Sequence, residues 1–273
     1  MTASGLRVHH LPCACIQGVS IHRRPLLCHC LLVETPASGL VLVDTGLGTQ
    51  DYLHPSSRLG VAFAYGFGRQ KRDPSLAAVV QIRKLGYDPA DVRHLVMTHL
   101  DLDHVGGMSD FPNAAVHVHA AELGAAITRE TRKARSRYRP AMWAHGPRFQ
   151  AYAEEGEPWF GFSAVRSLQG LPPEMLFVPL FGHSEGHSGV AINADSGWML
   201  HAGDAYFDPR EVDGKRRKCA PMVGLFQNIT NINRPLRLHN QARLRELRQA
   251  HPEIEMFCAH NPFEFPGPPV CTR

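Results

Sequence analysis

The chain has 273 residues, of which 44% are hydrophobic and 20% are charged, and we expect one globular domain spanning residues 1–273. It contains no run of about 20 apolar residues and begins without a basic region followed by an apolar one, so we expect a cytoplasmic protein with no membrane partner. The formal net charge of +4 is mild and the basic residues form no stripe along the chain, which argues against a nucleic-acid partner.

The cysteines are seven in number, an odd count. Cys13 with Cys15 and Cys28 with Cys30 form C-x-C pairs, whereas structural zinc sites use C-x-x-C pairs. We therefore expect reduced thiols, with Cys28 and Cys30 buried in a strand, where cysteine behaves as a small hydrophobic residue. A second metal site made by these four cysteines is the alternative.

Arginine and lysine concentrate in two short segments of the chain. We interpret both as solvated surfaces, one on a helix and one in a loop, and keep contact with an anion or a nucleic acid as the alternative. The first cluster consists of Arg129, Arg132, Lys133, Arg135, Arg137 and Arg139, and the second consists of Lys215, Arg216, Arg217 and Lys218.

The first third of the chain predicts a hairpin followed by a helix and a buried strand. Apolar runs at residues 26–33 and 40–43 flank a turn-forming segment, and the second run ends in Asp-Thr-Gly, which puts Asp44 at a strand end. Apolar residues at a spacing of about 3.6 predict a helix over residues 74–85. Residues 94–97 read as a strand that delivers Thr98 and His99 to its end.

The rest of the chain alternates short strands with helices. The order predicts the α/β class, of the α+β type, with two mixed sheets packed together and helices outside, an αββα sandwich. Residues 128–162 lack a clean period, and we interpret them as an insertion or lid. Strands are expected at residues 115–119, 175–180, 189–193, 198–201 and 254–258, and helices at 120–127 and 240–249.

Four potential metal ligands fall within six residues after the strand at 94–97. They are His99, Asp101, Asp103 and His104, and two glycines follow them. Imidazole and carboxylate without thiolate are ligands for zinc, iron or manganese, and this mixture is typical of a catalytic site. Further ligands are then expected at other strand ends, in the Gly-His-Ser-Glu-Gly-His segment at 182–187 and at Asp204 and His260.

This ordered set resembles the metallo-β-lactamase superfamily over residues 26–261. Its hydrolases carry a His-x-His-x-Asp-His motif, a later Gly-His-x-x-Gly-His motif, an Asp that bridges two metals and a terminal His. The resemblance implies His99 and His187 at the first metal, with His183 beside the ligands. It implies Asp103, His104 and His260 at the second metal, Asp204 as the bridge, and Asp44 as a carboxylate behind the ligands.

Asp101 departs from the family pattern, which has histidine at this position. A carboxylate still binds these metals, but its negative charge makes the first ion a weaker Lewis acid. The flavo-diiron proteins of the superfamily similarly have a carboxylate here. The resemblance implies two divalent ions. Zinc is the favoured metal, and iron and manganese are the alternatives.

The resemblance implies hydrolysis of a small molecule. Two adjacent ions make a metal-bound hydroxide available near pH 7, and Asp103 would hold metal and orient that water. The chain looks most like the N-acyl homoserine lactonases, so we expect opening of a lactone or cleavage of an ester, with Tyr206 as a donor to the carbonyl oxygen or as a packing residue. An acyl channel, or merely core, would use Phe63, Tyr65, Phe67, Met142, Trp143, Phe149, Trp159 and Phe160.

Three other functions stay open at this point. A thioesterase of the glyoxalase II type would bind glutathione through the basic cluster at 129–139. Asp101 suggests an iron-dependent oxidoreductase, although no Gly-rich flavin loop follows in the sequence. The fold could also serve as a binding protein with a weakened metal site, and a homodimer is left open.

Overall fold

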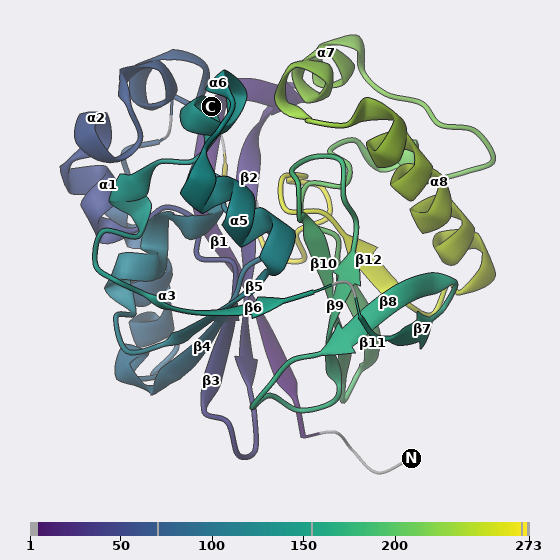
Figure 1. Cartoon of the computed structure of the whole chain (residues 1–273), viewed down its shortest axis with the longest axis horizontal. Helices are drawn as coiled ribbons and strands as arrows, with labels where there is room; N and C mark the ends of the chain where they lie inside the picture. Colours follow the sequence, from purple (N-terminus) through teal and green to yellow (C-terminus); the bar gives the residue numbers. More distant parts are fainter. Residues whose placement is uncertain (1–4, 70, 154, 269, 272–273) are drawn as a thin grey trace.

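Two six-stranded sheets pack face to face, with helices on their outer surfaces (Figure 1). This computed structural model describes residues 5–69, 71–153, 155–268 and 270–271. The first sheet has the order β1-β2-β3-β4-β5-β6, antiparallel from β1 to β3 and parallel from β3 to β6. Its strands are β1 (Arg7–Ile21), β2 (Arg24–Glu34), β3 (Leu40–Val43), β4 (Val92–Val96), β5 (Ala115–His119) and β6 (Arg148–Tyr152).

The second sheet has the order β12-β11-β10-β9-β8-β7. β11 and β12 are parallel, and the other pairs are antiparallel. Its strands are β7 (Glu157–Trp159), β8 (Phe162–Ser167), β9 (Met175–Pro179), β10 (Ser188–Ala194), β11 (Gly197–His201) and β12 (Glu255–Phe257). Both sheets are thus mixed, and the expected αββα arrangement is confirmed.

Helices cover the outer faces of both sheets (Figure 1). The α-helices are α1 (Thr49–Leu53), α2 (Pro55–Arg58), α3 (Ala78–Lys84), α4 (Leu102–Val105), α5 (Ala120–Thr128), α6 (Arg132–Arg137), α7 (Pro221–Thr230) and α8 (Arg234–Ala250). A π-helix, η1 (Ala62–Phe67), and five 3-10 turns complete the set: η2 (Pro74–Leu76), η3 (Pro89–Asp91), η4 (Gly106–Asp110), η5 (Pro140–Met142) and η6 (Pro209–Glu211). No helix in the described ranges is long and apolar enough to cross a membrane.

Three buried apolar clusters hold these layers together. Between the sheets, Val43 and Val96 of the first sheet meet Phe177 and Val190 of the second. A second cluster joins the first sheet to α3 and α5, and a third joins the second sheet to α8 through Leu244. The strand ends that carry the candidate ligands therefore rest on rigid, close-packed elements.

Most expected elements lie where the sequence predicts them, and two long ones were not foreseen. The hairpin of β2 and β3 and the helix after Pro74 are confirmed. β1 carries no clean period and was missed, and α7 was missed although Met222, Leu225, Phe226 and Ile229 follow a helical spacing. Within residues 128–162, β6 pairs with β5 as an edge strand of the first sheet, so this part of the segment belongs to the sandwich. α6, in the same segment, lies over the end of the sandwich (Figure 1).

The expectation that the cysteines are reduced is wrong for one pair. Cys15 in β1 and Cys271 form a disulfide with a Cα–Cα distance of 5.6 Å. The sequence concealed this pair because 256 residues separate the two cysteines, and only the fold returns the end of the chain to β1. Cys28 and Cys30 are buried in β2, as predicted.

Candidate metal centre

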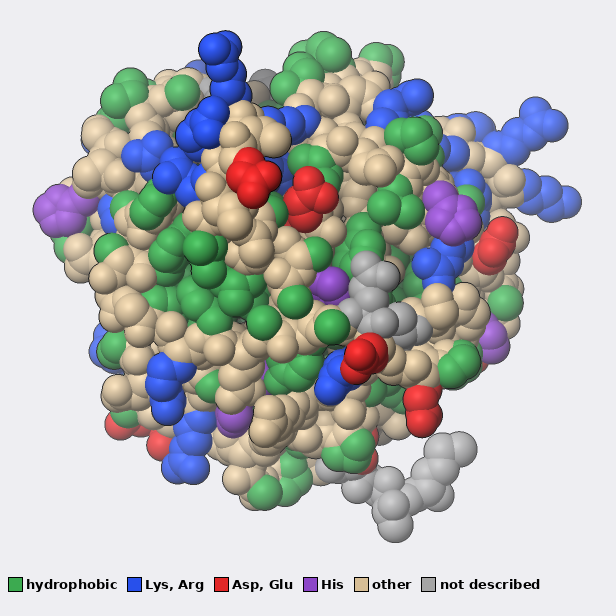
Figure 2. Space-filling model, viewed as in Figure 1, with side chains coloured by type: hydrophobic (Ala, Val, Ile, Leu, Met, Phe, Trp, Pro, Cys, Tyr) green, Lys and Arg blue, Asp and Glu red, His purple; other side chains and the backbone are tan. Residues whose placement is uncertain are grey.

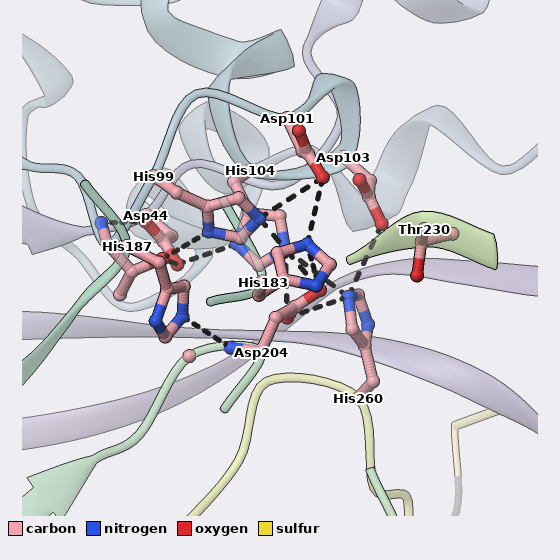
Figure 3. A network of polar contacts seen from close by, with 12 residues as sticks. Asp44, His99, Asp101, Asp103, His104, His183, His187, Asp204, Thr230 and His260 are labelled. Carbon is pink, nitrogen blue, oxygen red and sulfur yellow. Dashed lines mark hydrogen bonds and ion pairs between the residues drawn. The ribbon is translucent and has the colours of Figure 1, made fainter. Parts of the chain in front are cut away.

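The predicted ligands other than His187 meet at one edge of the sandwich, where strands end, and His183 joins them there (Figure 3). His99 follows β4, Asp204 follows β11, His260 follows β12, and His183 lies between β9 and β10. Asp101 is the residue before α4, and the first turn of that helix carries the remaining motif ligands. Because sheet pairing fixes each strand end, residues from distant parts of the chain come together here.

His99, Asp101 and His183 form the first group, and their ligand atoms lie within 4.8 Å of one another. Asp101 Oδ2 lies 3.4 Å from His99 Nε2 and 3.1 Å from His183 Nε2. Asp204 Oδ2 lies 3.4 Å from His183 Nε2. Two imidazole nitrogens and two carboxylates thus face one point, as the ligands of a transition metal do.

Asp103, His104 and His260 form the second group on the other side of Asp204. His260 Nε2 lies 3.4 Å from Asp103 Oδ2 and 3.2 Å from His104 Nε2. Asp204 Oδ1 lies 3.3 Å from His104 Nε2 and 3.2 Å from His260 Nε2. One oxygen of Asp204 therefore faces each group, which is the arrangement of a carboxylate that bridges two ions.

Hydrogen bonds at Nδ1 orient three of these histidines. His104 Nδ1 contacts Asp44 Oδ2 at 2.8 Å, His260 Nδ1 donates to the Leu27 carbonyl at 2.7 Å, and His99 Nδ1 lies 3.0 Å from Thr98 Oγ1. In each ring Nε2 is left to face the cluster. Partners behind the ligands commonly fix ring orientation at metal sites in this way.

The residues fit divalent ions. His99 Nε2 and Asp204 Oδ1 are buried, face the cluster and form no hydrogen bond with any described residue. A buried polar atom without a hydrogen bond is costly, and two such atoms facing one small region indicate that a ligand normally satisfies them. The nitrogen and oxygen donors suit zinc, iron or manganese. A carboxylate shared by two ligand groups, as Asp204 is, suits a pair of ions.

The electrostatics prepare the carboxylates to be ligands. Burial alone would raise the pKa of Asp204, but His260 and His104 outweigh it and hold that pKa well below its usual value. Arg137 and His99 do the same for the pKa of Asp101 against the effect of its burial. Burial, with Arg137 nearby, lowers the pKa of His183 to about 4, which keeps the ring neutral and able to coordinate.

His183, and not His187, faces the first group, which corrects the prediction made from the Gly-His-x-x-Gly-His motif. Both ring nitrogens of His187 are already used, because Nδ1 donates to the Leu180 carbonyl at 2.9 Å and Nε2 accepts from the Asp204 backbone N–H at 2.8 Å. Gly203 has a left-handed φ of +53°, and a Cβ there would lie 2.5 Å from His187 Nε2. His187 therefore positions the loop that carries Asp204.

Asp44 lies behind the second group, as predicted. Its carboxylate accepts hydrogen bonds from the backbone N–H of Thr98 at 2.8 Å and from the Thr98 hydroxyl at 2.7 Å, besides contacting His104. Asp44 also has a left-handed φ of +53°, an uncommon conformation for a residue other than glycine. This strained strand end ties the loop after β4 to the helix that carries His104.

Glu122 is a positioning residue that sequence reasoning missed. It is fully buried in α5, and Oε1 accepts from the Leu100 backbone N–H at 2.9 Å and from the Tyr138 hydroxyl at 3.0 Å. Oε2 accepts from the Gly186 backbone N–H at 2.9 Å. One carboxylate thus joins the two loops that carry the first group. The signal available in sequence was a lone glutamate in an otherwise apolar helix.

Arg137 was also missed, since the sequence interpretation put the whole cluster at 129–139 on a solvated surface. Its side chain is only 7% exposed, and Nη1 lies 3.4 Å from Asp101 Oδ2. Nη2 donates to the Thr230 carbonyl at the end of α7. The positive charge of Arg137 offsets the negative charge that Asp101 brings in place of histidine. Arg135 is exposed, as expected, whereas Arg129 is half-buried.

Tyr206 does not reach the cluster. Its side chain is buried, and its hydroxyl donates to Glu264 Oε1 at 3.0 Å. The next residue, Phe207, lines the pocket instead and stacks on His260 at a centroid distance of 5.1 Å. This position gives no support to Tyr206 as a donor to a substrate carbonyl.

A pocket of about 500 Å³ opens over the two ligand groups. Its floor includes Asp101, Asp103, His183, Asp204 and His260. Among the described side chains proposed for an acyl channel, only Phe63 lines it; Met142 and Trp159 are in the core, and the Phe67 side chain lies outside the described part. The other lining residues are Ile16, Val19, Leu26, Leu102, Arg132, Lys133, Ser136, Arg137, Phe207, Phe226, Ile229 and Thr230.

Comparison with known proteins identifies the family. The model of the metallo-beta-lactamase superfamily matches residues 23–257. A probable metallo-hydrolase of Mycobacterium tuberculosis is 43% identical over 262 residues, which cover 94% of this chain and 81% of that protein. The N-acyl homoserine lactonase of Bacillus cereus is 29% identical over 182 residues, which cover 65% of this chain and 63% of that protein.

Solved structures agree on the fold. An N-acyl homoserine lactone hydrolase with the product N-hexanoyl-L-homoserine at its catalytic metal centre superposes with a TM-score of 0.68, at 22% identity, over 96% of this chain and 94% of that one. The chain belongs to the metallo-β-lactamase superfamily. Its fold and its His/Asp clusters are those of a metal-dependent hydrolase.

Proposed function

We propose that this protein is a metal-dependent hydrolase that opens a lactone or cleaves an ester-type bond in a small molecule. The observation that carries the proposal is Asp204, whose two oxygens face two separate ligand groups on the floor of one pocket. The likeness to the Bacillus cereus N-acyl homoserine lactonase supports the choice of a lactone or ester. We expect two ions, zinc before iron or manganese.

The first ion would be held by His99, Asp101 and His183, and the second by Asp103, His104 and His260, with Asp204 shared. Two such ions, when bound, lower the pKa of a water molecule and polarise a carbonyl oxygen. The protein must then orient the water, hold the substrate and move a proton.

Asp103 is the residue best placed to move that proton. Its side chain is 13% exposed, it lines the pocket, and Oδ2 lies 3.4 Å from His260 Nε2. In hydrolysis, the water oxygen forms a bond to the carbonyl carbon, the bond from that carbon to the leaving oxygen breaks, and a proton from water passes to the leaving oxygen. A carboxylate on the pocket floor, as Asp103 is, can take up this proton from the water and return it to the leaving oxygen.

The remaining pocket residues hold the substrate and exclude water. Phe207 and Phe226 pack edge to face at a centroid distance of 5.5 Å and form an apolar wall next to His260. Apolar walls of this kind bind the non-reacting part of a substrate and strengthen polar interactions at the floor.

The test is a panel of a lactone, an ester, a thioester and a phosphodiester, assayed with purified protein of measured zinc content. We expect turnover of the lactone or the ester. Asp103→Asn should lower kcat by at least about a hundredfold, the usual contribution of general acid–base catalysis. Ser38→Ala, a change at a surface residue bonded to the Gly170 carbonyl, is the control and should leave kcat unchanged. Turnover of none of the four substrates by the zinc-loaded protein would refute the proposal.

A further inference from the structure

The pocket has two chemically different walls. α6 contributes the basic residues Arg132, Lys133 and Arg137, together with Ser136. α7 faces it with Phe226 and Ile229, and β1 adds further apolar side chains. Figure 2 shows the same division on the surface, where Lys and Arg side chains gather over α6 beside hydrophobic side chains over α7. A neutral, purely apolar acyl chain would use only the second wall.

The basic wall is fixed in place. Arg137 Nη2 donates to the Thr230 carbonyl and Lys133 Nζ donates to the Asn231 carbonyl, both at the C-terminal end of α7. Arg137 Nη1 is buried and lies 3.4 Å from Asp101 Oδ2, but it forms no hydrogen bond to any described residue. Nη1 carries two N–H groups, so it can donate to a further acceptor in the pocket while it stays paired with Asp101.

Ion binding leaves this wall without a balancing charge. Three basic side chains line the pocket, and so do three carboxylates, Asp101, Asp103 and Asp204. When these carboxylates hold divalent ions, their charge is taken up by the ions. The charges of Arg132 and Lys133 then face the pocket with no anionic partner among its lining residues.

We infer that the substrate carries an oxyanion, a carboxylate or a phosphate group, which α6 binds while α7 and β1 hold an apolar part. Arginine and lysine are the usual ligands of both anions, and arginine can form two parallel hydrogen bonds to either. The inference rests on the proposed hydrolase function and defines its substrate class. The reacting carbonyl lies over the ligands, and the oxyanion binds along α6.

The first test uses two esters that differ only in the charged group. These are 4-nitrophenyl pentanoate and the mono-4-nitrophenyl ester of glutaric acid, with spontaneous hydrolysis subtracted. We expect the zinc-loaded protein to prefer the charged ester by about tenfold or more in kcat/KM, the effect of one hydrogen bond to a charged group. Equal rates, or preference for the neutral ester, would overturn the inference.

Variants then show whether α6 is responsible. Arg132→Gln and Lys133→Gln should each raise KM for the charged ester by about tenfold and so reduce the preference for the charged over the neutral ester. Arg135→Gln is the matched control, because it removes the same charge from the same helix, while its guanidinium bonds the carbonyls of Arg129 and Glu130 outside the pocket. Equal effects of all three variants would show long-range charge only and would contradict a site on α6.

Calorimetry of binding separates this inference from the proposed function, because it needs no turnover. Hexanoate, hexyl phosphate and hexanol are titrated into the zinc-loaded protein. We expect both anions to bind more tightly than the alcohol. Their affinity should fall about tenfold in Arg132→Gln. The anion that binds more tightly then shows whether the substrate carries a carboxylate or a phosphate group. Unchanged affinity in this variant would show that the ions alone hold the anion. Binding as expected with no hydrolysis of any ester, lactone, thioester or phosphodiester would refute the proposed function and leave the anion site supported.

Discussion

Arg137 and Asp101 form an ion pair at the edge of the candidate metal centre, with 3.4 Å between Nη1 and Oδ2. The pair joins α6 to the first ligand group. A carboxylate in place of the family's histidine adds a negative charge, and the guanidinium adds a positive one beside it. The two residues therefore act as a unit, and changing one without the other leaves a charge unbalanced in a largely buried place.

Asp101→His should weaken the first ion's binding, although histidine is itself a good ligand. The neutral ring leaves Arg137 unpaired, and its positive charge then repels the ion. We expect about a tenfold loss of zinc affinity, since coupling between contacting residues is about 0.5 to 3 kcal/mol and a factor of ten corresponds to about 1.4 kcal/mol. Competition with a chromogenic chelator measures this affinity directly.

The double variant Asp101→His with Arg137→Gln is the control for that effect. It removes both charges and should recover most of the lost affinity. The interaction energy from the cycle of single and double variants is then well above 0.5 kcal/mol, the limit for independent sites. Additive effects would show that the ion pair does not tune the site.

His183→Ala and His187→Ala should differ in kind. His183→Ala removes a ligand, so we expect the zinc content to fall toward one ion per chain with little change in stability. His187→Ala leaves the Leu180 carbonyl and the Asp204 N–H unpaired, which should lower the free energy of unfolding by about 3 kcal/mol. Elemental analysis and urea unfolding separate the two outcomes; the reverse pattern would return His187 to the first ion.

Glu122→Ala should loosen both loops of the first ligand group. The substitution leaves three donors without an acceptor, two backbone N–H groups and the Tyr138 hydroxyl. We expect the free energy of unfolding to fall by about 3 kcal/mol or more and zinc binding to weaken with it. Tyr138→Phe removes a single one of these bonds and should cost about 1 kcal/mol. Equal losses in the two variants would contradict a special role for the carboxylate.

Reduction of the disulfide should destabilise the protein. Cys15 and Cys271 close a loop of 256 residues, so the bond restricts the unfolded chain strongly, and its loss should cost about 2 to 4 kcal/mol. Cys271→Ser should reproduce the effect, while Cys219→Ser, at a free and partly exposed thiol, should not. Thiol titration of the unfolded, unreduced protein should give five thiols; seven would show that the disulfide does not form.

The sequence predicted the fold and most ligands because each motif stands at the end of an apolar run. The strand ending at Val96 puts His99 at the sheet edge, and the order of motifs was enough to bring Asp204 and His260 to the same place. β1 was missed because its 15 residues mix polar and apolar side chains without alternation, and pairing with β2 holds it in the sheet.

The other features of the site depend on the direction in which side chains point and on contacts between distant segments. The spacing of residues in the sequence does not determine either. The choice between His183 and His187 is made by the Leu180 carbonyl and the Asp204 N–H, which occupy both nitrogens of one ring. Arg137 looked like one more exposed arginine, and only the packing of α6 on the loop of Asp101 buries its guanidinium. The disulfide was not predicted because it, too, depends on a contact between distant parts of the chain.

Metal removal and replacement test the central claim most directly. The purified protein is stripped with a chelator, dialysed, and reloaded with measured amounts of zinc, manganese or ferrous iron, and bound metal and ester or lactone hydrolysis are measured on the same samples. The account predicts that hydrolysis disappears with the metal and returns as the content approaches two ions per chain. Full hydrolysis by the stripped protein, or failure to bind more than a trace of any of the three metals, would contradict it.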